Sequence, residues 1–228
     1  MINRGGFLSS HTNKLILINI LIFLLMVITY NLIIVRFNVD GKDYVYYSRS
    51  PLNIILGREI SGLQFLLSQV NYLVIHNGFI WQLLTSMFIH IGIIHLMFNM
   101  VALYIFGNIT ENNFGKRNFL IIYFVSGLSG NIATLFLLKY LHTFGDFIPS
   151  AGASGAIFGL VGAYAALGRL SGSFAAGVSY ALIIFLFSSL FPNVNIFAHL
   201  FGLIGGFITA YLLSRKFINK NEIILDYY

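Results

Sequence analysis

The sequence has no cysteine, and only 9% of its 228 residues carry a charged side chain. The absence of cysteine excludes disulfide bonds, thiolate metal sites and a cysteine nucleophile, so any nucleophilic chemistry must come from another side chain. The scarcity of charge excludes an ordinary soluble domain, in which about a quarter of the residues are charged. Most of the surface must therefore face a medium other than water.

Apolar residues make up 58% of the chain, and they gather in long runs. Residues 15–35 contain no Asp, Glu, Lys or Arg, and about 20 helical residues suffice to cross a hydrocarbon layer of about 30 Å. The chain is therefore predicted to be an all-α polytopic membrane protein with six transmembrane helices. Their expected positions are residues 15–35, 90–109, 118–138, 151–168, 175–190 and 196–213.

An irregular, partly interfacial loop is predicted between the first two spans. Residues 36–59 are polar and contain Asp-Gly and Ser-Pro turn signals, together with tyrosines that suit the lipid headgroup region. Residues 61–84 lack formal charge, but polar side chains such as Asn71 interrupt them. We expect this second stretch to be a helical excursion along the interface and not a crossing.

Basic residues outnumber acidic residues by 13 to 7, for a net charge of +6. They punctuate the apolar runs instead of clustering, so they indicate loop anchors beside anionic lipid and no nucleic-acid partner. With the amino terminus inside, 8 of the 13 lie in cytoplasmic segments, which predicts a multi-pass protein of the cell membrane with both termini cytoplasmic. The expected organisation is a cytoplasmic segment at residues 1–14, a membrane domain at 15–214 and a cytoplasmic tail at 215–228.

Ser154 lies among small residues in the run Ala151-Gly-Ala-Ser154-Gly, shortly after Pro149. A helix that begins just after this proline would place Ser154 in its first turn. Backbone N–H groups are unpaired there, and with the positive end of the helix dipole they can stabilise the charge that an attacking serine creates on a carbonyl oxygen. Small residues of this kind also serve simply to pack membrane helices, and that alternative stays open.

His199 is the candidate base for such a serine. It lies in the last predicted span, with Gly202 and Gly206 three and seven residues later on the same helical face. A second stripe of glycines accompanies Ser154 in the fourth span, and glycines let two helix backbones approach closely. We therefore expect the fourth and sixth spans to pack together and to bring His199 beside Ser154.

His95 and Asn99 are four residues apart in the second predicted span. On a helix this spacing puts both side chains on one face, where each can donate a hydrogen bond to the same oxyanion. In the predicted topology they share the outer half of the membrane with Ser154 and His199. A single histidine at membrane depth could instead be a satisfied structural donor.

Four motifs follow one another between about residues 81 and 206. They are Trp81-Gln82, His90-x4-His95-x3-Asn99, the Gly-x-Ser154-Gly string and Ala198-His199-x2-Gly202. In this order they resemble the rhomboid family of intramembrane serine proteases. The resemblance implies that Ser154 is the nucleophile and His199 the general base, with an oxyanion hole from His95, Asn99 and the Ser154 backbone N–H.

The resemblance also implies partners. Substrates are expected to be single-span membrane proteins in the lipid bilayer, cut in or near their transmembrane segment at a site that opens to the outer side. No metal or cofactor is expected, and the sequence favours no particular oligomeric state. The alternative is a catalytically silent rhomboid-like protein that binds membrane clients.

Three further residues bear on this interpretation. The family usually has arginine where this chain has Gln82, and a neutral amide can supply only hydrogen bonds to anchor its loop. Phe158, one turn after Ser154, could stack under the His199 ring or could simply fill the core. Asp146 is interpreted as part of a solvated loop and not as a partner of the histidine.

Overall fold

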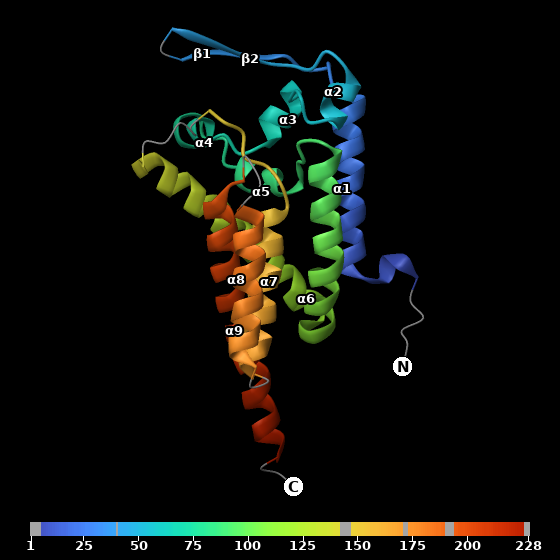
Figure 1. Cartoon of the computed structure of the whole chain (residues 1–228), viewed down its shortest axis with the longest axis vertical. Coiled ribbons are helices and arrows are strands. Elements are labelled where there is room, and N and C mark those ends of the chain that lie inside the picture. Colours follow the sequence, from blue (N-terminus) through green and yellow to red (C-terminus); the bar gives the residue numbers. More distant parts are fainter. Residues whose placement is uncertain (1–5, 40, 142–146, 171–172, 190–193, 226–228) are drawn as a thin grey trace.

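The computed structural model describes residues 6–39, 41–141, 147–170, 173–189 and 194–225, which form a helical bundle with one β-hairpin at its end (Figure 1). The elements in chain order are η1 (Phe7–Ser9), α1 (His11–Ile28), β1 (Val35–Val39), β2 (Lys42–Tyr46), α2 (Pro51–Ile55), α3 (Gly62–Leu67), α4 (Asn71–Asn77), α5 (Gln82–Thr85), η2 (Ser86–Phe88), α6 (Ile93–Leu141), α7 (Ser154–Leu170), α8 (Phe174–Ser189) and α9 (Ile196–Leu225).

Three helices of the described residues are long and apolar enough to cross a membrane, namely His11–Ile28, Ile93–Leu137 and Ile196–Ser214. Two shorter apolar helices cover Ser154–Gly168 and Ala175–Leu186. The predicted helical membrane architecture is therefore confirmed, and the number of six crossings stays a prediction. The division of the chain at residues 14 and 214 also stays a prediction, and α9 runs past the second of these points to Leu225.

Helix α6 contains both the second and the third predicted spans. Its backbone leaves helical geometry at Gly115, where φ is +77°, so two helices meet there. Glycine adopts this left-handed conformation without the steric cost that a β-carbon imposes. The first part of α6 lies beside α1, and the second part turns away toward the other helices (Figure 1). The boundary expected between residues 109 and 118 is thus confirmed.

The first predicted span is wrong at its carboxyl end. Helix α1 stops at Ile28, and Val35 already belongs to the antiparallel hairpin β1–β2, in which Phe37 pairs with Tyr44. The rings of Phe37 and Tyr46 stack on Phe65 of α3, with centroids 5.5 and 3.9 Å apart. An apolar run does not by itself distinguish helix from strand, and here the aromatic contacts with a distant segment favour the strand. The segment predicted as irregular loop therefore holds regular structure.

The start of α1 is set by a contact with α6. Glu111 of α6, whose side chain is 7% exposed, accepts hydrogen bonds from Ser10 Oγ, His11 N, Thr12 N and Thr12 Oγ1 at 2.8 to 2.9 Å. A carboxylate at a helix amino terminus satisfies unpaired N–H groups and complements the helix dipole. This contact explains why α1 begins four residues before the predicted span.

Helices α7 and α9 pack backbone against backbone through their glycines. A β-carbon added to Gly202 would overlap the Gly155 carbonyl, and one added to Gly206 would overlap the Gly159 carbonyl. Helix α7 also contacts α6 and α8, and most of its side chains are buried. The predicted packing of the fourth and sixth spans is therefore confirmed.

Candidate functional site

Ser154 is the first residue of α7, so it lies in the first turn of its helix as predicted, although the helix begins three residues after the expected start at residue 151. The segment before it is held against the loop between α1 and α6. Ser150 and Gln69 exchange two backbone hydrogen bonds of 2.9 Å, and Gly152 N donates to Ser86 O at 2.9 Å. These contacts fix the chain on entry to α7, so the first turn and its free N–H groups have a defined position.

His199 lies in the first turns of α9, and Asn195 positions this helix end. Asn195 Oδ1 accepts from Ala198 N at 3.0 Å, which is the pattern of an amino-terminal cap. Its Nδ2 donates to Thr134 Oγ1 of α6 and to Ser150 Oγ, both at 3.0 Å. Asn195 thus ties the start of α9 to the segment that leads to Ser154. Sequence analysis missed it, although an asparagine just before an apolar helical run is a capping signal.

The ring of His199 is 5% exposed and lies flat on Phe158 of α7. The two ring centroids are 4.2 Å apart and the planes are inclined by 21°. Of the two roles considered for Phe158, stacking under the histidine is the one found. The stack fixes the plane of the imidazole, and Nδ1 lies 3.3 Å from Ser188 Oγ of α8.

His95 reaches the same end of α7 from the first part of α6. A β-carbon added to Gly152, whose φ is +129°, would lie 2.9 Å from His95 Nε2 and 3.7 Å from Ser154 Oγ. Only a glycine leaves room there. His95 Nε2 and Ser154 Oγ therefore both lie next to the space that a side chain at residue 152 would fill. On the other side of the ring, Ile91 N approaches His95 Nδ1 at 3.4 Å as a donor. With Nδ1 accepting, a neutral His95 carries its proton on Nε2, which lies beside Gly152.

Asn99 lies one turn after His95 and is 6% exposed. Its Nδ2 donates to His95 O at 2.9 Å, and the second hydrogen of the amide remains for another acceptor.

His90, predicted near the membrane surface, is fully buried, and its ring meets the His95 ring edge-on with the ring centroids 5.1 Å apart. In the described residues Ser154 Oγ and His199 make no hydrogen bond to each other; such bonds are often long until substrate binds.

Residues 77–216 match a family model described as the rhomboid domain. The chain belongs to the rhomboid family. Bacillus subtilis (strain 168) YdcA is 38% identical over 148 residues, which cover 61% of this chain and 70% of that protein. The rhomboid protease GluP of the same strain is 41% identical over 140 residues, 59% of this chain and 26% of GluP. The Arabidopsis thaliana protein named inactive RHOMBOID-like protein 8 is 32% identical over 154 residues, 64% of this chain and 41% of that protein.

The resemblance drawn from the motifs is thereby confirmed at the level of the family. The matched region contains all four predicted site residues as well as Gln82 and Phe158. The chain spans about a quarter of the length of GluP and less than half of RHOMBOID-like protein 8. Family membership and the multi-pass helical architecture together make this a membrane protein of the rhomboid class.

Gln82, which stands where the resemblance implies arginine, is the first residue of α5 and is fully buried. Its Oε1 accepts from Val70 N at 2.9 Å, and its Nε2 donates to Leu66 O at 3.1 Å. Trp81 Nε1 approaches the same Leu66 carbonyl at 3.4 Å. The neutral amide therefore anchors the loop through hydrogen bonds to two backbone groups.

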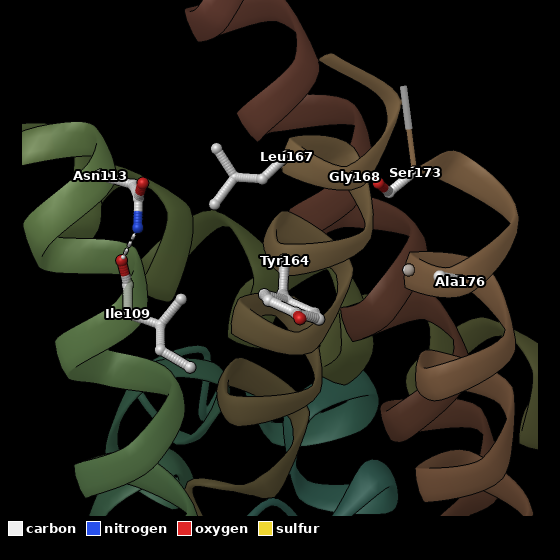
Figure 2. Close-up of a pocket in the computed structure, with 8 residues that line it drawn as sticks. Ile109, Asn113, Tyr164, Leu167, Gly168, Ser173 and Ala176 are labelled. Carbon is white, nitrogen blue, oxygen red and sulfur yellow. Dashed lines mark hydrogen bonds between the residues drawn. The ribbon is translucent and has the colours of Figure 1, made fainter. Parts of the chain in front are cut away.

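A cleft of about 540 Å³ opens elsewhere, between the first part of α6, α7 and α8 (Figure 2). Tyr164 of α7 lies in it, ten residues after Ser154 and hence about 15 Å further along the helix. Across the cleft, the Asn113 amide turns back to donate to Ile109 O of its own helix at 2.7 Å (Figure 2). The cleft is thus separate from the end of α7 at which the predicted site residues gather. No three His, Asp or Glu side chains gather as metal ligands in the described part of the chain.

Proposed function

We propose that this rhomboid is an intramembrane serine protease, which hydrolyses a peptide bond in or near the transmembrane segment of a membrane-protein substrate. One observation carries the proposal: Ser154 Oγ and His95 Nε2 both lie close to the position that a β-carbon of Gly152 would occupy. This position is at the amino-terminal end of α7, and the glycines of α7 pack against α9, the helix of His199. A serine nucleophile, a histidine and an oxyanion donor have to meet in this way for acyl transfer.

In this proposal Ser154 Oγ attacks the scissile carbonyl carbon, and His199 accepts the serine proton as general base. His199 then gives that proton to the leaving amine as the C–N bond breaks. Water, activated by the same histidine, hydrolyses the acyl-enzyme and restores the serine. No carboxylate partner is assigned: Asp146, interpreted from the sequence as part of a solvated loop, lies outside the described residues.

The tetrahedral oxyanion is held by the Ser154 backbone N–H, His95 Nε2–H and the free hydrogen of the Asn99 amide. The tautomer of His95 supports this role, since its Nδ1 approaches the Ile91 N–H and its Nε2 lies beside Gly152, two residues before Ser154. One donor of this kind typically stabilises a transition state by about 3 to 4 kcal/mol.

The substrates in this proposal are single-span membrane proteins that enter sideways from the lipid. A stable helix does not present its carbonyls to a nucleophile, so a segment weakened by small or helix-breaking residues is favoured. In the orientation that the basic residues predict, the protein lies in the cell membrane with both termini cytoplasmic. Ser154 then opens to the outer side.

The alternative is a rhomboid-like protein that binds membrane clients without cutting them, and one relative carries the word inactive in its name. The presence of both Ser154 and His199 in adjoining helices favours the protease. The test incubates the purified protein in detergent micelles with a tagged single-span substrate whose helix contains Gly and Pro. We expect a shorter tagged product with the parent and none with Ser154→Ala, while intact substrate with both would support the client-binding alternative.

A further inference from the structure

Ser188 of α8 is the residue of this region to which neither the motifs nor the proposed function assign a role. Its hydroxyl oxygen lies 3.3 Å from His199 Nδ1, across the boundary between α8 and α9. The same hydroxyl donates to the Phe185 carbonyl, three residues earlier in α8, at 2.8 Å. Ser188 therefore contacts His199 on the ring edge that carries Nδ1.

We assign the Ser188 hydrogen to the Phe185 carbonyl, because that contact is the shorter of the two and a carbonyl oxygen can only accept. A serine hydroxyl has one hydrogen and two lone pairs, and this assignment directs the hydrogen to the Phe185 carbonyl. Toward His199 the oxygen can then only accept, which requires a proton on Nδ1. In the neutral imidazole the other nitrogen, Nε2, is left with a bare lone pair, and a bare nitrogen is what a general base needs.

We infer that Ser188 is a positioning residue that holds His199 in the tautomer with its proton on Nδ1 and its lone pair on Nε2. The catalytic meaning of this inference rests on the proposed function. When His199 accepts the serine proton, the Nδ1–H becomes part of an imidazolium, and its bond to Ser188 Oγ becomes charge-assisted. A neutral hydroxyl thus takes the orienting place that a carboxylate occupies in soluble serine triads.

Two contacts together fix the orientation of the His199 ring. Phe158 fixes its plane by stacking, and Ser188 fixes which edge faces α8. His95 is held in the opposite state, since its Nδ1 accepts from Ile91 N and its Nε2 keeps the proton. The two histidines would therefore present complementary groups, a donor from His95 and an acceptor from His199.

A serine that donates to its own helix could also be a mere packing residue, and the chain offers a matched control for that role. Ser214 of α9 donates to the Tyr211 carbonyl, three residues earlier, at 2.7 Å, and it is 7% exposed. Ser214→Ala removes the same type of bond as Ser188→Ala at a distance from His199. Ser188→Thr keeps a hydroxyl and is the conservative variant.

The decisive measurement is the nitrogen NMR spectrum of protein labelled with ¹⁵N-histidine in detergent micelles, near neutral pH. The His199 signals are identified by their loss in His199→Ala. We expect a protonated Nδ1 and a bare Nε2 in the parent, Ser188→Thr and Ser214→Ala, and a mixture of both tautomers in Ser188→Ala. A proton on Nε2 in the parent, or an unchanged spectrum in Ser188→Ala, overturns the inference; should Ser188→Ala fail to fold, the parent and Ser188→Thr decide it.

The kinetic arm uses the single-span substrate on the same four proteins. We expect kcat to fall about tenfold in Ser188→Ala with KM unchanged, as for the loss of one hydrogen bond, while Ser188→Thr and Ser214→Ala stay near the parent. A parent with the expected tautomer that cleaves no substrate refutes the proposed function and leaves the Ser188–His199 bond established. Equal kcat in Ser188→Ala and Ser214→Ala refutes the positioning role.

Discussion

At the scale of single residues, each proposed site group is held by a different type of contact. Ser154 is held by the backbone that enters α7, His199 by ring stacking on Phe158, and His95 by a backbone donor and by its approach to Gly152. None of these contacts uses a formal charge. This is what a low-dielectric medium favours, since a buried unpaired charge is costly there.

Loss of an oxyanion donor should have a different effect from loss of the general base. Asn99→Ala or His95→Ala removes one donor of three, so we expect cleavage about 100- to 1,000-fold slower than in the parent, with a measurable residual rate. His199→Ala, which removes the base, should abolish turnover. Product formation over long incubations distinguishes the two classes, and an Asn99→Ala enzyme as fast as the parent would remove Asn99 from the oxyanion hole.

Glu59, in the loop before α3, should make that loop sensitive to acid. Its carboxylate accepts from the Arg49 backbone N–H, from Asn53 and from Ser48 Oγ, and these bonds lower the pKa of Glu59 below its usual value. A lowered pKa stabilises the folded loop fully above the unfolded pKa of about 4.3, and this contribution disappears as the pH falls through the folded pKa.

Hydrogen-exchange protection of the amides near Arg49 measures this effect. We expect protection to decrease below about pH 4 in the parent, and to be weaker and independent of pH over that range in Glu59→Gln. The bulk of the helices serves as internal control. Equal protection of the loop at pH 3 and pH 6 would show that the carboxylate does not hold it.

At the scale of elements, the contact of α7 with α9 decides the geometry of the site. The glycine pairs bring the two backbones so close that carbonyl oxygens occupy the space of a side chain. The same contact sets the relative height of Ser154 and His199, which belong to the two helices. Packing and chemistry therefore depend on the same residues in this part of the molecule.

Gly206→Leu should destabilise the protein, because its side chain would collide with the backbone at Gly159. Overpacking typically costs about 1 to 3 kcal/mol, and a clash with backbone belongs at the upper end or above. Ala175→Leu, at an exposed position of α8, adds a large side chain without such a clash and is the control. Thermal unfolding in detergent should show a lower midpoint for Gly206→Leu only, and equal midpoints would contradict the observed packing.

At the scale of the whole molecule, the bundle has two unlike ends. The hairpin β1–β2 and the helices α2 to α4 gather at one end, and α1 begins and α9 finishes toward the other (Figure 1). Ser154 starts α7 at the end that faces the loop with the hairpin, because the segment before it is bonded to that loop, Ser150 to Gln69 and Gly152 to Ser86. In the orientation that the basic residues predict, this end is the outer one, and that orientation stays a prediction.

A reporter fused after Tyr228 tests that orientation. We expect it to behave as cytoplasmic, for instance as a fluorescent protein that folds in the cytoplasm or as an alkaline phosphatase that stays inactive there. The reason is the excess of basic residues in the segments assigned to the cytoplasm. A matching fusion within the loop near Asn38 should give the opposite signal, and an external signal after Tyr228 would reverse the topology.

The sequence alone determined the helical membrane class, the break between the second and third spans, the place of Ser154 in the first turn of its helix and the glycine faces of α7 and α9. These features follow from local rules, namely composition, helical spacing and the backbone preferences of proline and glycine. The motifs also indicated the family, because their order along the chain is itself sequence information.

Only the tertiary structure decided the hairpin after α1, the capping of α1 by Glu111, and the contacts of Asn195 and Ser188 with the site. Each of these is an interaction between segments that are apart in the chain, and Glu111 and Thr12 are separated by 99 residues. The local sequence pattern around one residue does not indicate a partner that lies far away in the chain. The side chain's role depends on which donor or acceptor the packed helices bring within about 3 Å of it, and that distance exists only once the bundle has formed.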